Sequence, residues 1–316
     1  MKIFIHLPTW LGDAVMASPA LYGIYHHFKN AHFILYGSFV STALFKDFPN
    51  AKIIVEDKKT RYKQALSLRK KLHSLDLALS FRSALSSKLI LHLLKAKQRH
   101  FFDKKKHKEE HQVLKYLYFA ENAAAIKIHS KDLKLPFKLK FQGPLRLKNG
   151  KKILGLNPGA SFGNAKRWDS SYFAKVALNF SKTHEILIFG AGKEEQILCD
   201  EIFKILKEQN IKAKNLCNKT TLKTLCQNIA FCDIFITNDS GPMHLGAAYK
   251  TKTIAIFGPT KFTQTSPWQN ENARLVYLKL ACMPCMQKAC PLKHHSCMKD
   301  LSPQLVIEEA KNLLNF

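Results

Sequence analysis

The sequence carries one acid whose setting suits chemistry. The stretch PTWLGDAVMASPA, residues 8–20, follows a short apolar run and has a single glycine, Gly12, directly before Asp13. A turn that holds phosphate through its backbone N–H groups usually has more glycines and no carboxylate. Asp13 at the start of an apolar helix is therefore either a helix cap or a catalytic group. These residues alone leave both roles open.

The loop at residues 159–168, GASFGNAKRW, has the composition of an anion-binding site. Its glycines and small polar residues let backbone N–H groups approach an anion, and Lys166 and Arg167 add positive charge. The GxxxxGK[ST] spacing of a P-loop is absent. A glycine-containing turn with one lysine is more often only a turn, so that alternative stays open.

Residues 237–248, TNDSGPMHLGAA, place a polar turn at the start of a helix. Proline suits the first helical turn, and the Ser-Gly pair before it leaves backbone donors pointing outward. Such a helix start would bind a diphosphate if it faced one. Asp239 or Ser240 could equally do no more than cap the helix, and His244 could be a core histidine.

The segment FGAGKEEQ, residues 189–196, is only part of a dinucleotide-binding motif. Glu195 stands where the third glycine of G-x-G-x-x-G is needed, so a dinucleotide dehydrogenase is poorly supported. Glu194 or Glu195 could bind a ribose hydroxyl, although acids are also common at exposed helix starts. No D-x-D pair occurs in the chain, so the sequence does not indicate a metal-dependent sugar-nucleotide enzyme.

The net charge is the unusual bulk property. The 316 residues include 50 Lys and Arg against 23 Asp and Glu, which gives +27 at pH 7, whereas the hydrophobic fraction of 46% is ordinary. The excess favours nucleic acid, an anionic membrane or nucleotides as partners, although part of it could be only a lysine-rich surface. No apolar run is long enough to span a bilayer, and the N-terminus lacks a signal-peptide pattern. We therefore expect a cytoplasmic protein.

Strand-like and helix-like segments alternate twice along the chain. In the N-terminal half we expect helices at 14–28 (interrupted by Pro19) and 60–73, and strands at 2–8, 32–37, 51–56 and 75–81. After a linker-like segment at 137–152, we expect helices at 170–182 and 193–208, and strands at 152–158, 185–190, 232–238 and 253–258.

This alternation predicts an α/β protein with two Rossmann-like domains that face each other across a cleft. We place the domains at residues 1–145 and 146–316. Ligands of open α/β sheets bind at the carboxyl ends of the strands, so the strand-to-helix loops of both domains should line that cleft. Whether a final helix at 303–315 packs back on the first domain stays open.

Four blocks together resemble a known enzyme family: LPTWLGDAVMASPAL, SFRSAL, NPGASFGNAKRWDSSYFAKVA and NDSGPMHLGAAYKTKTIAIFGPT. They are similar to the ADP-heptose:lipopolysaccharide heptosyltransferases of glycosyltransferase family 9, and within that family to the type II rather than the type I enzymes. The matching blocks span residues 3–268. The resemblance implies a GT-B fold and an inverting, metal-independent transfer of a heptose from its ADP carrier.

The resemblance also implies roles for individual residues. Asp13 matches the general base, and Lys166 matches the lysine that binds the diphosphate. The other matches to donor-binding positions are Ser161, Glu194, Asp239, Ser240, Gly241, Pro242 and His244. One base for the acceptor hydroxyl and one cationic site for the leaving diphosphate are what an inverting transfer needs.

The acceptor implied for the type II enzymes is heptosyl-Kdo2-lipid A, which is anionic, acylated and anchored in a membrane. We expect the N-terminal domain to bind it through Trp10, Arg82, Ser83 and Arg99, with Lys104 to Lys106 near Kdo carboxylates or anionic headgroups. Any one of these lysines could be only part of a solvated loop. The expected location is the cytoplasmic face of the inner membrane, with no required cofactor and no nucleic-acid partner.

Three alternatives remain. A type I enzyme would act on Kdo2-lipid A, which has no heptose. A basic, non-catalytic nucleic-acid-binding protein would account for the charge, but the sequence has neither a helix-turn-helix signal nor an RNP-type strand. A GT-B-like nucleotide-sugar epimerase would release no heptosylated product.

Four of the eight cysteines cluster in CMPCMQKACPLKHHSC, residues 282–297. Together with His294 and His295 nearby, they could form a tetrahedral, structural zinc site, starting from a C-x2-C pair; the four are Cys282, Cys285, Cys290 and Cys297. The next gaps, of four and six residues, match no standard zinc-finger spacing, so free thiols or disulfides stay open. We expect buried thiols at the other four, Cys199, Cys217, Cys226 and Cys232.

Overall fold

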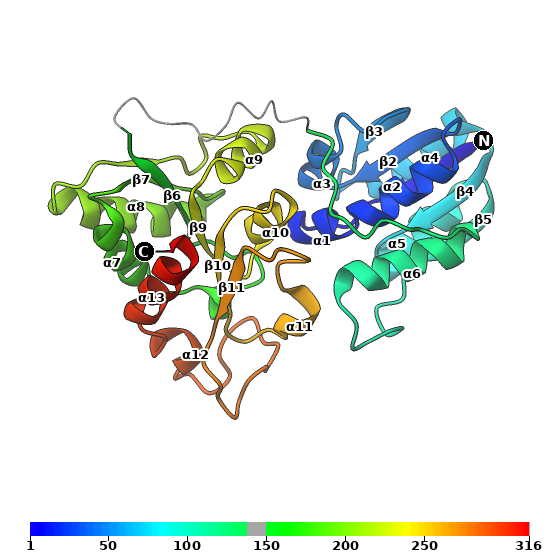
Figure 1. Ribbon diagram of the computed structural model, residues 1–316. Coiled ribbons are helices and arrows are strands. Elements are labelled where there is room, and N and C mark those ends of the chain that lie inside the picture. Colours follow the sequence, from blue (N-terminus) through cyan, green and yellow to red (C-terminus); the bar gives the residue numbers. More distant parts are fainter. Residues whose placement is uncertain (138–149, 316) are drawn as a thin grey trace. The chain divides into compact units, whose positions relative to one another are not determined.

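The computed structural model describes residues 1–137 and 150–315, which form two compact units (Figure 1). The units comprise Met1–Lys138 and Leu139–Phe316. The boundary expected at 145/146 falls within 138–149, outside the described residues. Each unit has its own parallel β-sheet with helices packed against it, as the two rounds of alternation predict.

Unit 1 contains a five-stranded sheet in the order β3-β2-β1-β4-β5. All its neighbouring strands are parallel. The strands are β1 (Lys2–His6), β2 (His32–Gly37), β3 (Ala51–Val55), β4 (Leu75–Ser80) and β5 (Ala96–Phe101). Because the central strands are covered on both faces, they are almost continuously apolar and buried. The first four confirm the expected strands.

Six helices accompany this sheet: α1 (Leu11–Met16), α2 (Ser18–His27), α3 (Phe39–Leu44), α4 (Arg61–Leu72), α5 (Leu85–Leu93) and α6 (Gln112–Ala124). The chain breaks between α1 and α2 at Ala17, because Pro19 lies in the first turn of α2 and has no N–H to continue a helix. The sequence patterns missed α3, α5, α6 and β5. Strand β5 lies at the sheet edge, where polar and charged residues are tolerated, so residues 95–115 look like a charged loop.

Unit 2 contains a six-stranded parallel sheet in the order β11-β10-β9-β6-β7-β8. Its strands are β6 (Lys152–Asn157), β7 (His184–Ile188), β8 (Ala213–Asn215), β9 (Ile234–Asn238), β10 (Thr253–Ile256) and β11 (Ala273–Val276). This is the strand order of the doubly wound dinucleotide-binding fold, with the reversal between β6 and β9. The expected strands β6, β7, β9 and β10 are confirmed, whereas the short strands β8 and β11 were not anticipated.

The helices of unit 2 are η1 (Asn164–Lys166, a 3₁₀ turn), α7 (Ser170–Phe180), α8 (Lys193–Glu208), α9 (Leu222–Ala230), α10 (Gly241–Ala248), α11 (Phe262–Thr265), α12 (Ser296–Lys299) and α13 (Pro303–Leu314). The C-terminal helix α13 packs on α7, β10 and β11 of its own unit, and Val306 and Ala310 lie in the unit's core. The four cysteines expected to be buried thiols are buried and unpaired.

No helix in the two described ranges combines the length and the hydropathy needed to cross a membrane.

Candidate active site

The acid Asp13 lies just beyond the carboxyl end of β1, where ligands of open α/β sheets bind. It occupies the third position of α1, while Trp10 is the N-cap and makes no capping hydrogen bond with its side chain. Its Oδ1 accepts a hydrogen bond of 3.2 Å from the hydroxyl of Tyr116 on α6. The side chain is therefore not the helix cap, and it is held by a second helix while staying partly exposed.

Tyr116 is suited to donate this bond. Its side chain is buried, and burial together with the neighbouring Asp13 carboxylate raises the pKa of Tyr116 well above its usual range. The phenol therefore stays protonated and donates a hydrogen bond to the carboxylate of Asp13. A hydrogen bond to a carboxylate fixes the orientation of that carboxylate, which is what a general base requires.

Arg82 follows β4 at the same edge of the sheet and is held by two strong contacts. Its Nε donates to the carbonyl of Leu7 at 2.6 Å, and its Nη1 lies 2.6 Å from Glu56 Oε2. The arginine side chain is 10% exposed and that of the glutamate 1%. Nη2 of Arg82 is buried and makes no hydrogen bond to any residue that the structure describes. The guanidinium is thus firmly held at this edge of the sheet, with one buried donor unused.

The carboxyl group of Glu56, the partner of Arg82, is kept ionised by its neighbours. Burial alone would raise the pKa of Glu56, but the His6 ring and the Arg82 guanidinium outweigh it and lower that pKa to about 2. Burial lowers the pKa of His6 to about 4, so its ring is neutral at pH 7. Glu56 is therefore paired with two arginines, Arg82 and, at 3.7 Å, Arg61.

The other expected acceptor residues differ in their settings. The Trp10 side chain is 57% exposed, and Ser83 is partly exposed directly beside Arg82. Arg99 on β5 instead donates to the carbonyls of Leu91 and Leu94, at 3.0 and 2.6 Å. Its guanidinium thereby satisfies backbone groups at the end of α5, a structural role that its sequence context did not reveal. Acceptor binding by these residues remains a prediction.

The centre of the unit 2 site is Lys166, which follows β6. Its Nζ lies 2.5 Å from Oδ2 of Asp239 and 4.9 Å from the centroid of the Phe162 ring. The same carboxylate oxygen accepts a 2.6 Å hydrogen bond from the Thr260 hydroxyl. Asp239 is 4% exposed, whereas Lys166 is partly exposed. The buried acid therefore positions the ammonium group, and the lysine is the member of the pair that can meet a ligand.

A second network ties the β6 loop to the β9 loop. The side-chain amide of Asn157 donates to the Ser240 hydroxyl at 3.1 Å and to the Thr237 hydroxyl at 3.3 Å. The amide of Asn238 donates to the carbonyl of Pro158 at 2.7 Å, and its oxygen accepts from the backbone of Trp168. These contacts join the two loops that the sequence singled out separately.

Helix α10 begins at Gly241 and Pro242, as expected. Ser240 is its N-cap residue, but its side chain makes no capping hydrogen bond because the hydroxyl is engaged with Asn157 and Thr237. Capping by Asp239 or Ser240 therefore does not explain this loop. His244 is 3% exposed, which agrees with the alternative that it is a core histidine.

The predicted ribose-binding acid lies at the start of α8. The side chain of Glu194 is 76% exposed and pairs with Nη2 of Arg167. Glu195 points the other way: it lies against Gly159, accepts from the backbone of Ala191 at 2.8 Å, and has its pKa raised by burial. Any side chain at position 159 would collide with this carboxyl group. Ser161, the other expected donor residue, is exposed in the β6 loop.

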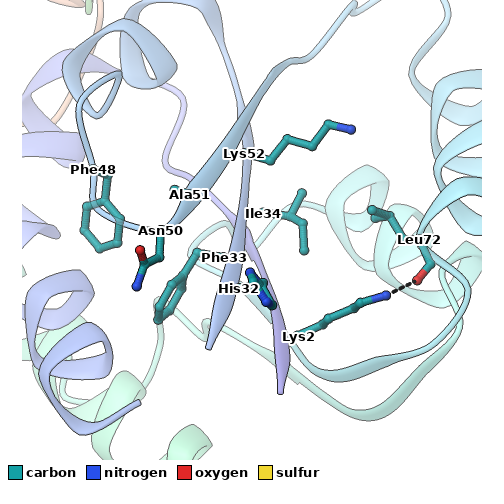
Figure 2. A pocket seen from close by; sticks show the side chains of 9 residues that line it. All are labelled: Lys2, His32, Phe33, Ile34, Phe48, Asn50, Ala51, Lys52 and Leu72. Carbon is teal, nitrogen blue, oxygen red and sulfur yellow. Dashed lines mark hydrogen bonds between the residues drawn. The ribbon is translucent and has the colours of Figure 1, made fainter. Parts of the chain in front are cut away.

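A pocket of about 580 Å³ lies at the opposite edge of the unit 1 sheet (Figure 2). Its lining includes Lys2, His32 and Ala51, the first residues of β1, β2 and β3. The ligand sites of open α/β sheets lie at the carboxyl ends of the strands instead. This pocket is therefore not part of the candidate site.

Sequence reasoning missed the residues that hold the site together. Tyr116, Glu56 and Thr260 each act through a partner far away in the sequence, and no local spacing marks them. A signal existed for Thr260, because the GPT of residues 258–260 ends the last block of the family resemblance.

Comparison with known proteins decides the family. The model of glycosyltransferase family 9 (heptosyltransferase) matches residues 65–296. The chain belongs to this family. Lipooligosaccharide heptosyltransferase 2 of Campylobacter jejuni serotype O:2 is 81% identical to this member over 99% of the chain and 98% of that protein. The expected resemblance is thus confirmed, and the chain is a glycosyltransferase.

Solved structures of heptosyltransferases share the fold of this family 9 enzyme. Escherichia coli ADP-heptose lipopolysaccharide heptosyltransferase II has a TM-score of 0.81 at 24% identity, covering 100% of this chain and 99% of that one. E. coli heptosyltransferase WaaC with ADP has a TM-score of 0.73 at 13% identity, covering 99% and 100%. These likenesses confirm the GT-B class of fold.

Proposed function

We propose that this enzyme transfers L-glycero-D-manno-heptose from ADP-heptose to heptosyl-Kdo2-lipid A, with inversion at the anomeric carbon. The observation that carries the proposal is the 81% identity, over nearly the whole chain, to a lipooligosaccharide heptosyltransferase 2. The geometry of each unit supports it, because unit 1 holds an oriented carboxylate and unit 2 holds a cation at a sheet edge.

In unit 1, Asp13 acts as the general base. As the acceptor hydroxyl attacks the anomeric carbon, its proton passes to an oxygen of the Asp13 carboxylate. The Tyr116 hydrogen bond to Oδ1 helps to orient the carboxylate for this transfer. Because one base on the face opposite the leaving group suffices for inversion, a second carboxylate of the kind that hydrolysis uses is not required.

In unit 2, Lys166 stabilises the leaving group. The bond from the anomeric carbon to the diphosphate oxygen breaks as the new glycosidic bond forms, and negative charge grows on ADP. An ammonium group that is already positioned at the diphosphate offsets this charge without reorganisation. Asp239 and Thr260 supply that positioning, and the turn before α10 supports the diphosphate with backbone donors.

Mass spectrometry of the product tests the transfer. The purified chain with ADP-heptose and heptosyl-Kdo2-lipid A should yield an acceptor that is heavier by one heptose, together with an equal amount of ADP. A heptose product that is epimerised or merely hydrolysed, with unchanged acceptor, would contradict the proposal. Transfer to Kdo2-lipid A alone would assign the chain to the type I reaction.

The proposed acceptor lies in a membrane, and helices α4 and α5 of unit 1 offer a surface for anionic lipid. The two helices pack against each other. Their outer faces expose Tyr62, Leu66, Leu85 and Leu89 among the cations Lys63, Arg69, Lys70, Lys71 and Lys88. Exposed apolar side chains among basic ones are typical of proteins that lie on an anionic membrane surface. We place the enzyme at the cytoplasmic face of the inner membrane on this basis.

Vesicle sedimentation tests this surface. The wild type should bind vesicles containing phosphatidylglycerol and not pure phosphatidylcholine, and the double variant Leu66→Gln, Leu89→Gln should bind several-fold more weakly. Ile197→Gln is the matched control, because Ile197 is an equally exposed apolar residue on α8 of unit 2. Equal weakening by the control, or no weakening by the double variant, would remove the assignment.

A further inference from the structure

The segment between β11 and α12 has neither regular secondary structure nor fully buried side chains to stabilise it. Residues 277–295 contain no helix or strand, and none of them is buried. Long irregular segments in compact domains are uncommon and usually have a function. Leu278, Leu280 and Met283 pack against the core of unit 2, whereas residues 284–295 add no side chain to that apolar cluster, so a further source of stability is needed there.

This segment supports the loop that carries Lys166. The backbone N–H of Ala165 donates to the carbonyl of Lys288 at 3.1 Å, and Nε2 of His295 lies 2.9 Å from the carbonyl of Ala165. Gly163 packs so closely against the backbone of Lys288 that no side chain fits there. The position of Lys166 therefore depends on the shape of residues 277–295.

The clustered cysteines line one small cavity at this segment. The cavity measures about 20 Å³, close to the space that a single water molecule needs, and all four cysteines of the cluster line it. They are Cys282, Cys285, Cys290 and Cys297. The backbone N–H of His295 donates to Sγ of Cys290 at 3.4 Å.

Each of the two histidines beside the cavity already makes a hydrogen bond through one ring nitrogen. Nδ1 of His294 accepts a 2.9 Å hydrogen bond from the backbone N–H of Ser296, so in its neutral form the proton is on Nε2 and neither nitrogen offers a lone pair. Nε2 of His295 faces a carbonyl oxygen and must donate to it. The four cysteine sulfurs are therefore the largest donor set around the cavity, and Nδ1 of His295 is the one other ring nitrogen with an unused lone pair among these two described histidines.

We propose that Cys282, Cys285, Cys290 and Cys297 bind one Zn²⁺ ion tetrahedrally. A donor set of four thiolates is typical of structural zinc. In the described part of the chain no three His, Cys, Asp or Glu side chains already converge as metal ligands, so binding draws the sulfurs inward. Three of the four cysteines, Cys282, Cys285 and Cys290, lie in the irregular segment, which can adjust towards Cys297 on α12.

The ion has a structural role. It cross-links residues 277–295, which lack a core of their own, and thereby fixes the support beneath Gly163 and Ala165. Loss of the ion should loosen the Lys166 loop and weaken the binding of ADP, without removing any group that acts on the reacting atoms. This inference is independent of the choice of acceptor.

Metal analysis of the full-length, untagged chain, purified without chelators, tests the site. Inductively coupled plasma mass spectrometry should find about one zinc per chain. The double variant Cys285→Ser, Cys290→Ser should lose the zinc, melt at a lower temperature and bind ADP several-fold more weakly. The control Cys226→Ala, a cysteine outside the cluster, should keep its zinc.

A second measurement tests the site even if the double variant fails to fold. Wild-type protein exchanged into Co²⁺ should show the strong thiolate-to-cobalt charge-transfer absorption of a tetrahedral sulfur site. Three results would overturn the proposal: a stable wild type without bound metal, zinc retained in the double variant, or a mass that reveals disulfides among the four cysteines.

Discussion

The hydroxyl of Tyr116 lies 3.2 Å from Oδ1 of Asp13, joining two side chains that are 103 residues apart in the sequence. The bond connects α6 to α1 and gives a first-turn helix acid an oriented carboxylate. The phenol thus helps to orient the proposed base.

The variant Tyr116→Phe tests this contact. We expect kcat to fall about 10-fold, the cost of losing one hydrogen bond to a charged group. Tyr118→Phe on the same helix is the control and should leave kcat unchanged. An unchanged kcat in Tyr116→Phe would show that the phenol does not position Asp13 for catalysis.

Replacing the base itself should abolish chemistry and spare donor binding. Asp13→Asn keeps the size of the side chain but cannot accept a proton, so we expect transfer to fall by roughly 100-fold or more. The affinity for ADP, measured by calorimetry, should stay near wild type because the donor residues lie in unit 2. Near-normal turnover of Asp13→Asn would refute the assignment.

Lys166 requires a paired design, because removing it leaves Asp239 buried with one partner fewer. Lys166→Met should weaken ADP binding by roughly 10-fold to 100-fold and also lose thermal stability. The double variant Lys166→Met, Asp239→Asn should recover stability, since no buried charge is left, while the affinity for ADP stays low. Lys175→Met on α7 serves as the exposed control. Affinity that returned with stability would mean that Lys166 has only a structural role.

The buried His6 predicts a pH dependence of stability in unit 1. Its pKa is lowered to about 4 in the fold, so below about 6.5 the unfolded chain binds more protons than the folded one. Its contribution to stability is therefore lost as the pH falls from about 6.5 towards 4. Glu56, with its pKa lowered to about 2, loses its own contribution between about 4.5 and 2.

Thermal unfolding across pH measures this effect. The melting temperature of the wild type should fall between pH 7.5 and 5, and it should fall less in His6→Gln, which cannot titrate. His26→Gln, an exposed histidine on α2, is the control. The same fall in wild type and His6→Gln would remove His6 as its source.

The fold was predictable from the sequence wherever a strand is buried on both faces. Strands β1, β2, β6 and β9 are continuous apolar runs that end at turn residues, which is the signal that pattern reasoning uses. Edge strands such as β5 and β11 lack that signal because one side faces solvent or a loop. Their position follows from pairing with a neighbour, which local spacing does not encode.

The candidate site was predictable at the residues proposed to face ligand and not at those that hold them. Asp13 and Lys166 lie in loops of distinctive composition directly after strands. Their partners Tyr116 and Thr260 lie on other elements, and the tertiary fold alone brings them into contact. The sequence context of Arg99 likewise did not reveal that its guanidinium donates to backbone carbonyls at the end of α5.

The choice of acceptor is the most direct test of the proposed function. Purified enzyme with ADP-heptose should be given Kdo2-lipid A and heptosyl-Kdo2-lipid A in separate reactions, and the rate of ADP release and the mass of the product should be measured in each. The account predicts addition of one heptose to heptosyl-Kdo2-lipid A and little or no transfer to Kdo2-lipid A. Turnover with only the acceptor that lacks heptose would contradict it.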